Sequence, residues 1–174
     1  MLHVNDILLL GYVLTVAVID TTRHRIPNML TVSAAAAALV LGTMAHGADG
    51  LLAAAGGLLV GFLLFLPLYL LGGFGAGDVK ALAAAGGFLG PQGAVLATVC
   101  TLIMGGIGGM AVLLATGGFP ALKCMLRRWT FRAYVVGATG RAAAIRADSD
   151  DAARRRFPYG IAIACGVAAS LLLG

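Results

Sequence analysis

The sequence predicts an all-α membrane protein, a bundle of about six transmembrane helices. Hydrophobic residues make up 60% of its 174 residues and charged residues only 11%, and the mean hydropathy is +0.99. Soluble domains average about 25% charged residues. Long apolar runs alternate with short connections rich in glycine, proline or charge, which is typical of a chain that crosses the membrane several times. We expect a single membrane domain over residues 1–174, with a basic cytoplasmic segment at about 117–157.

Six apolar runs are candidates for the spanning helices. A helix that crosses the hydrocarbon core needs about 20 mostly apolar residues, within a range of about 17–25. Pro27 is expected in the first turn of the second helix, a position that proline favours, and Pro158 stands at the start of the last. The candidates are residues 4–20, 29–45, 51–71, about 78–90, about 94–116 and about 158–173.

The stretch from Ala81 to Thr116 requires two helices. It is apolar throughout and broken only by GPQG at residues 90–93, which makes it too long for one span. The first of the two helices, at about 78–90, is only about 20 Å long at a rise of about 1.5 Å per residue. We therefore expect it to begin below the membrane surface.

The basic residues favour six spans with the N-terminus and the C-terminus both outside. In that arrangement all 12 lysines and arginines fall in cytoplasmic connections, where membrane proteins accumulate them. If residues 81–116 formed a single span, the basic segment would lie on the side opposite Arg23 and Arg25. The net charge of +5 is therefore interpreted as a determinant of orientation and not as a nucleic-acid site.

The composition also limits the ligands that the chain is expected to bind. Cys100, Cys124 and Cys165 are widely spaced and form no CxxC pair, so neither a metal site nor a disulfide framework is indicated, and we expect no cofactor. Residues 121–136 combine arginines with three aromatic residues, which suits an interfacial helix on anionic membrane lipid. The oligomeric state is not indicated.

Two aspartates, Asp20 and Asp78, form the candidate catalytic site. Asp20 closes the first helix and Asp78 opens the fourth, so both are expected at the cytoplasmic membrane boundary. Ionisable groups at such depth are costly and usually face a cavity or a partner. Two carboxylates placed close together share a proton. The ionised one can then take a proton from water while the protonated one polarises a peptide carbonyl, which is acid–base hydrolysis without a covalent intermediate.

A glycine-rich loop precedes Asp78, and both features allow other interpretations. Gly72, Gly73, Gly75 and Gly77 are expected to take positive φ angles and to approach a substrate strand closely. Alternatively, the two acids only cap or flank helix ends and the glycines form a turn. Two further functions remain open. One is a small ion- or proton-coupled transporter subunit with the acids at interrupted helices, and the other is a non-catalytic component of a pilus or secretion assembly.

Three motifs resemble the type IV prepilin peptidases, a family of GxGD-type intramembrane aspartic proteases. GAGDVK at residues 75–80 resembles the GxGDxK signature, IDTTRHRIPN at 19–28 resembles the segment of the first aspartate, and FPYGIAIACG at 157–166 resembles the element that opens the last helix. The resemblance implies that Asp20 and Asp78 are the catalytic pair. Gly75, Gly77 and Lys80 belong to the supporting motif. Positions that are substrate-proximal under this resemblance, or else helix starts and topology anchors, are Arg23, Arg25, Pro27, Asn28, Pro158, Tyr159 and Gly160.

The resemblance also implies a substrate and a location. Members of the family remove the short basic leader of prepilins at the cytoplasmic face of the bacterial inner membrane, just ahead of the hydrophobic pilin helix. Long members carry a cytoplasmic insert with two CxxC pairs and methylate the new N-terminus. This sequence has neither, so it resembles the short, peptidase-only branch that serves tight-adherence (Flp) pili. Methyl transfer is accordingly not expected.

Overall fold

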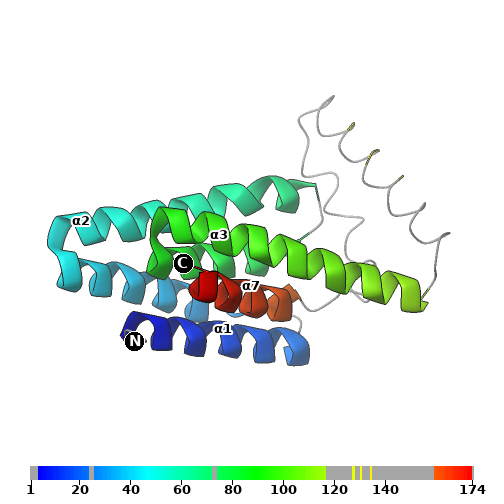
Figure 1. The fold of residues 1–174 in the computed structure, drawn as a ribbon, viewed down its shortest axis with the longest axis horizontal. Helices are drawn as coiled ribbons and strands as arrows, with labels where there is room; N and C mark the ends of the chain where they lie inside the picture. Colours follow the sequence, from blue (N-terminus) through cyan, green and yellow to red (C-terminus); the bar gives the residue numbers. More distant parts are fainter. Residues whose placement is uncertain are drawn as a thin grey trace.

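The protein is all-helical over the residues that the structure describes. The computed structural model describes residues 4–23, 26–71, 74–116 and 159–173, together with Arg127, Thr130 and Tyr134. Four helices account for nearly all of them, and no strand occurs in these ranges (Figure 1). They are α1 (Val4–Arg23), α2 (Asn28–Leu70), α3 (Ala76–Thr116) and α7 (Tyr159–Leu173). The predicted helical class is confirmed.

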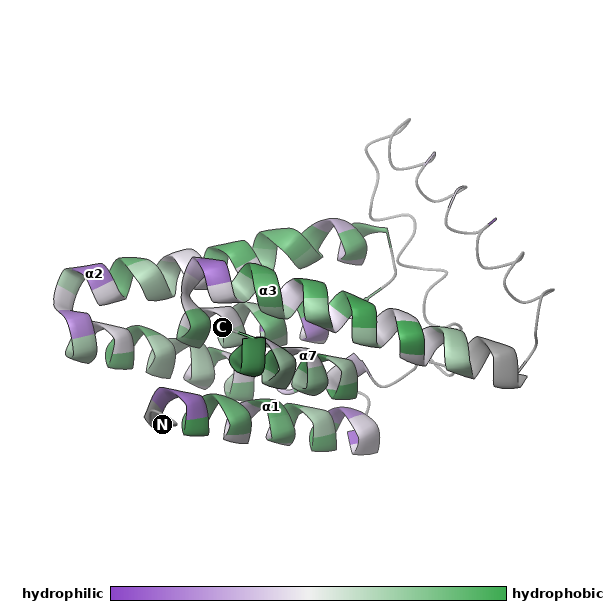
Figure 2. Ribbon diagram, viewed as in Figure 1, coloured by the Kyte–Doolittle hydropathy of each residue, from purple (hydrophilic) through white to green (hydrophobic). Residues whose placement is uncertain are grey.

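Three of these helices are long and apolar enough to cross a membrane. The candidate spans are Asn5–Arg23, Asn28–Leu70 and Ala76–Ala111, and α7 is a shorter apolar helix. Large apolar side chains cover the outside of the bundle: Leu14 and Val18 of α1 are 60% and 62% exposed. Figure 2 shows hydrophobic positions along the helices and hydrophilic positions at helix ends and turns. Such a surface matches lipid and not water, and the chain is a membrane protein.

Both long helices contain a glycine at which the backbone leaves the helical conformation. Gly47 has φ 62° and ψ −135° within α2, and Gly90 has φ 72° and ψ 178° within α3. Positive φ carries little steric cost only for glycine, and Pro91 cannot donate the next helical hydrogen bond. In Figure 1 each helix turns back on itself at this point, so α2 and α3 each consist of two arms. The turns fall at HGADG, residues 46–50 between the second and third candidate helices, and at GPQG, residues 90–93 between the fourth and fifth.

The start of α2 differs slightly from the prediction. Pro27 has an extended conformation, with φ −63° and ψ 135°, and it precedes the helix as the N-cap residue. Its carbonyl accepts a hydrogen bond from the Leu30 N–H at 3.1 Å. The expectation that Pro27 lies inside the first turn is therefore wrong by one position. Proline suits either place, because its fixed φ is compatible with both conformations.

Glycine contacts hold α2 against α3. A Cβ atom built on Gly57 would overlap the backbone of Gly86, and one built on Gly86 would overlap the carbonyl of Gly57. Gly61 lies close to the carbonyl of Leu82 in the same way, since a Cβ there would be 2.9 Å from that oxygen. Small residues allow backbones in a membrane to approach this closely and to gain van der Waals contact.

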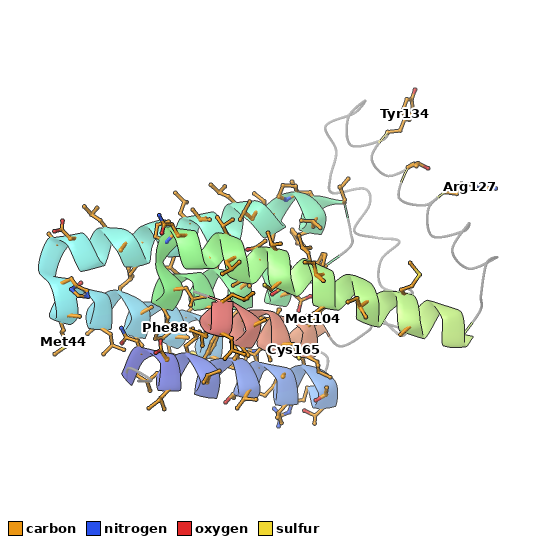
Figure 3. All side chains as sticks on the ribbon, viewed as in Figure 1. Met44, Phe88, Met104, Arg127, Tyr134 and Cys165 are labelled. Atoms are coloured by element: carbon orange, nitrogen blue, oxygen red, sulfur yellow. The ribbon has the colours of Figure 1, made fainter. Side chains whose placement is uncertain are left out.

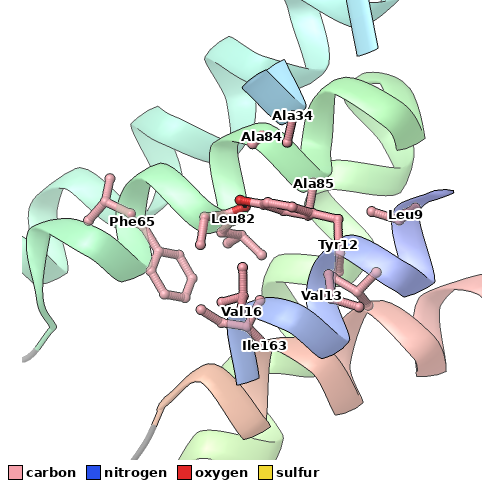
Figure 4. Close-up of a cluster of buried hydrophobic side chains, with 14 residues drawn as sticks. Leu9, Tyr12, Val13, Val16, Ala34, Phe65, Leu82, Ala84, Ala85 and Ile163 are labelled. Carbon is pink, nitrogen blue, oxygen red and sulfur yellow. The ribbon is translucent and has the colours of Figure 1, made fainter. Parts of the chain in front are cut away.

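The core of the bundle lies between α1, α3 and α7. Val16 of α1, Leu82 of α3 and Ile163 of α7 are almost completely buried there, beside Phe65 of α2 (Figure 4). The buried Tyr12 hydroxyl donates a hydrogen bond to the Ala81 carbonyl at 3.3 Å. Outside this core, side chains such as Met44, which is 80% exposed, project from the bundle (Figure 3).

Helix α7 connects α1 and α3 by packing between them. In Figure 1 α7 lies between them. It packs extensively on both, whereas α1 and α3 share few direct contacts. The end of α1 and the start of α7 lie at one end of the bundle, opposite the turns in α2 and α3.

Candidate active site

Asp20 is buried in the last turn of α1, and its partner comes from α7. Its side chain is 8% exposed, and its Oδ2 accepts a hydrogen bond from the Gly160 N–H at 2.8 Å. The C-terminal end of a helix is a poor place for a carboxylate, because the helix dipole is negative there. The N-terminal end of another helix offers unpaired N–H groups and the positive end of its dipole. Asp20 thus lies at the N-terminal end of α7, where the helix dipole stabilises a negative charge.

Asp78 is buried to the same extent in the first turn of α3. It is 8% exposed, and its Oδ2 accepts a hydrogen bond from the Gly75 N–H at 2.9 Å. A carboxylate in the first turn that reaches back to the residue before the helix forms half of a capping box. This contact stabilises the start of α3, so Asp78 has a structural role whatever else it does.

Both acids are linked to the start of α7. Gly160 donates its N–H to Asp20, while the ring of the preceding residue, Tyr159, packs on Phe74, the neighbour of the glycine whose N–H binds Asp78. The carboxyl groups therefore lie near the same helix start, although they are 58 positions apart in the sequence. Among the described aspartates these two are buried, whereas Asp6 is half-buried and Asp49 is exposed.

Phe74 connects the glycine loop with this site. Its ring centroid lies 4.5 Å from that of Tyr159 and 4.8 Å from that of Phe65, in an edge-on arrangement. Sequence reasoning did not single out Phe74. A lone aromatic residue among four glycines was the available signal, because so large a side chain in a turn usually needs a packing partner.

Two further contacts join the segment around residues 26–28 to the start of α3. The Lys80 Nζ donates a hydrogen bond to Asn28 Oδ1 at 2.9 Å. A Cβ atom at Gly77 would lie 3.2 Å from the Ile26 Cβ. Gly77 is helical and does not have the positive φ expected for it. Its lack of a side chain instead makes room for Ile26.

The other predicted site residues are only partly described. Arg23 ends α1 and is exposed, as are Pro27 and Asn28. Several residues named in the sequence analysis lie outside the described part of the chain: Arg25, Gly72, Gly73, Pro158 and most of the basic segment 117–157. Within the described ranges no group of three or more His, Cys, Asp or Glu residues is arranged to hold a metal ion.

Comparison with known families decides the classification. The model of the type IV leader peptidase family matches residues 7–110, which is more than half of the chain and includes both buried aspartates. The chain belongs to the type IV leader peptidase family. No curated protein and no solved structure matches the sequence. The family expected from the three motifs is confirmed, and membership of this peptidase family makes the protein a protease of prepilin substrates.

The family match does not cover every residue of the candidate site. The matched residues end at 110, whereas the N–H group that binds Asp20 belongs to α7, which begins at Tyr159. The resemblance of residues 157–166 to the family's last helix pointed to Tyr159 and Gly160. It did not reveal that the Gly160 backbone contacts Asp20, because a contact over 140 positions depends on how α1 and α7 pack.

Proposed function

We propose that this type IV leader peptidase is an aspartic endopeptidase in which Asp20 and Asp78 activate water together. The observation that carries the proposal is that the two buried aspartates of the described chain both lie near the start of α7, Asp20 through Gly160 and Asp78 through the loop that packs on Tyr159. A buried carboxylate at a helix end can be purely structural, as the capping contact of Asp78 illustrates. Two of them beside one helix start, in a peptidase family, are better explained by acid–base chemistry.

The proposed reaction uses one proton shared between the two carboxyl groups. The ionised aspartate takes a proton from water as the water oxygen bonds to the carbonyl carbon of the scissile peptide, and the protonated aspartate donates its proton to the carbonyl oxygen. The tetrahedral intermediate then collapses: the C–N bond breaks, the amine nitrogen receives a proton from the first aspartate, and the oxygen returns its proton to the second. Both acids end in their starting protonation states, and no covalent enzyme intermediate forms.

The proposed topology has six spans, with both termini outside and the acids at the cytoplasmic face of the inner membrane. The reversals at Gly47 and Gly90 support it, because they divide α2 and α3 into arms that run in opposite directions. The first arm of α3, residues 76–89, is about 21 Å long at a rise of about 1.5 Å per residue. That is shorter than the hydrocarbon core of about 30 Å, so Asp78 at its start would lie below the membrane surface.

The proposed substrate is an Flp-like prepilin, cut between its leader and its hydrophobic N-terminal helix. The three cysteines of the sequence include no CxxC pair, which supports the peptidase-only branch without methyl transfer. Residues 121–136 of the basic segment would bind anionic lipid at the same face, since each basic residue near such a surface contributes about 1 kcal/mol.

Co-expression with a candidate Flp-like prepilin tests the proposal. The wild-type protein should shorten the prepilin by its leader, whereas Asp20→Asn and Asp78→Asn should leave it full length at equal membrane levels. Asp49→Asn is the matched control, because Asp49 is exposed beside the turn at Gly47. Processing that survives either buried-site change would favour a non-catalytic assembly component or an ion-coupled subunit instead.

A further inference from the structure

We propose that the start of α7 positions the catalytic pair, with the Gly160 N–H orienting Asp20 and the Tyr159 ring holding Phe74 and, through it, the loop that binds Asp78. The proposal rests on the proposed function of the two aspartates and adds a component outside the family-matched residues. Tyr159 and Gly160 are positioning residues here: they act on the carboxyl groups, and the carboxyl groups act on substrate and water.

The packing of the helices makes α7 the helix that sets the position of Asp20 relative to Asp78. Asp20 belongs to α1 and Asp78 to α3, and these two helices share few direct contacts. Each packs instead on α7, which lies between them (Figure 1). A small displacement of the α7 start would therefore change the separation of the two carboxyl groups.

Gly160 fits this role because α1 leaves no room for a side chain there. A Cβ atom at position 160 would lie 2.7 Å from the Asp20 Cβ and 3.2 Å from the Ala17 Cα. Real Cβ atoms do not approach that closely, so only glycine allows the N–H to come within 2.8 Å of Asp20 Oδ2. With Oδ2 held by this bond, the proposal assigns Oδ1 to the water or the peptide.

The Tyr159 ring is held from two sides. It packs against Phe74 with a centroid separation of 4.5 Å. On α3, a Cβ atom at Gly105 would lie 3.3 Å from the Tyr159 Cε1, so this glycine provides the space that the ring edge occupies. Phe74 precedes Gly75, whose N–H binds Asp78 Oδ2 at 2.9 Å, so the ring acts on Asp78 by holding this loop in place.

A nuclear magnetic resonance experiment tests the Asp20 contact without any activity measurement. The sequence contains a single Tyr-Gly pair, residues 159–160. Labelling tyrosine with ¹³C at the carbonyl and glycine with ¹⁵N therefore gives one correlated amide signal in the full-length protein in detergent. Asp20→Ala should move this signal and accelerate its hydrogen exchange by about fivefold or more, the effect of losing one hydrogen bond. Asp49→Ala should change neither, and an unchanged signal in Asp20→Ala would overturn the proposal.

Cleavage kinetics test whether the contacts matter for catalysis. Gly160→Ala and Tyr159→Leu should each lower kcat by about tenfold to a hundredfold, the cost of misplacing a catalytic group by about 1 Å. KM should stay within about twofold, and the pH–rate profile should shift. Gly11→Ala is the matched glycine control, since a Cβ there meets nothing within 4 Å. Tyr159→Phe keeps the ring contact with Phe74 and should retain the wild-type kcat, so it is the matched control for Tyr159→Leu.

The outcomes separate this inference from the proposed function. If Asp20→Asn and Asp78→Asn are inactive but Gly160→Ala and Tyr159→Leu retain the wild-type kcat and pH–rate profile, the catalytic pair stands and the positioning role is wrong. If prepilin is not cut by the wild-type protein, the proposed function fails, while the amide signal of Gly160 still decides whether Asp20 binds it.

Discussion

The Lys80 ammonium donates a hydrogen bond to the Asn28 side chain at 2.9 Å, across 52 positions of the sequence. This contact joins the start of α2 to the start of α3. Lys80 lies two residues after Asp78, and residues in that relation do not face each other on a helix. The described contact of the lysine side chain is therefore with α2, through Asn28.

We predict a small and non-additive effect of breaking this link. Lys80→Ala and Asn28→Ala should each slow prepilin cleavage by about two- to fivefold, because a single exposed hydrogen bond contributes little. The double variant should be no slower than either single one, since both changes remove the same contact. Single-turnover cleavage rates at one pH measure the three variants, and simple multiplication of the two single effects would show that the residues act separately.

The loss of stability caused by Gly77→Ala should be reversed by a smaller side chain at position 26. In Gly77→Ala the new methyl group lies 3.2 Å from the Ile26 Cβ, so Ile26 and α3 must move apart by a few tenths of an ångström. Overpacking of this kind costs about 1–3 kcal/mol, which outweighs the gain of up to about 1 kcal/mol from replacing a helical glycine by alanine. Adding Ile26→Ala should recover stability and activity, as judged by thermal unfolding in detergent and by cleavage rate. A double variant with the same low stability and cleavage rate as Gly77→Ala alone would contradict this explanation.

The contact between α2 and α3 should tolerate no side chain at Gly57. Gly57→Ala places a methyl group in the backbone of Gly86, and backbone cannot rotate away as a side chain can. We expect a loss of about 2–3 kcal/mol in the free energy of unfolding. The control is Gly106→Ala in α3, where a Cβ meets nothing within 4 Å; it should be neutral or stabilising by up to about 1 kcal/mol. Denaturation in mixed micelles compares the two, and equal stability would refute the close approach.

Loss of the Phe74 ring should affect both stability and turnover. Phe74→Leu keeps an apolar side chain but removes the ring contacts with Phe65 and Tyr159, each of which contributes about 0.5–1.5 kcal/mol. Because Phe74 also holds Tyr159, kcat should fall more than KM rises. Phe62→Leu, at a 39% exposed position of α2, serves as the control for aromatic loss. Steady-state cleavage and thermal unfolding of both variants provide the comparison.

Much of the fold could be predicted because local sequence determines it. The chain reverses at Gly47 and Gly90, where glycine permits the positive φ that other residues resist. These positions were expected as connections from their glycine, proline and charge alone. Asp20 and Asp78 became the candidate site for a related reason, since an acidic residue at the end of an apolar run stands out in a membrane chain.

The contacts within the site were not predictable in the same way. Gly160 binds Asp20 over 140 positions, and Phe74 reaches Tyr159 on a different helix. Both contacts depend on how α7 lies between α1 and α3, and neither hydropathy nor residue spacing reports that packing. The explanation offered for Gly77 was also incorrect, because a glycine that avoids a steric clash and one that adopts positive φ look identical in the sequence.

Cooperation between Asp20 and Asp78 is tested most directly by single-turnover prepilin cleavage with the purified protein, comparing Asp20→Asn, Asp78→Asn and the double variant. If the two carboxyl groups activate one water molecule together, each single change removes nearly all of the rate and the double change removes no more, as for other residues that act as a unit. Cleavage at the wild-type rate by either single variant would contradict the shared mechanism.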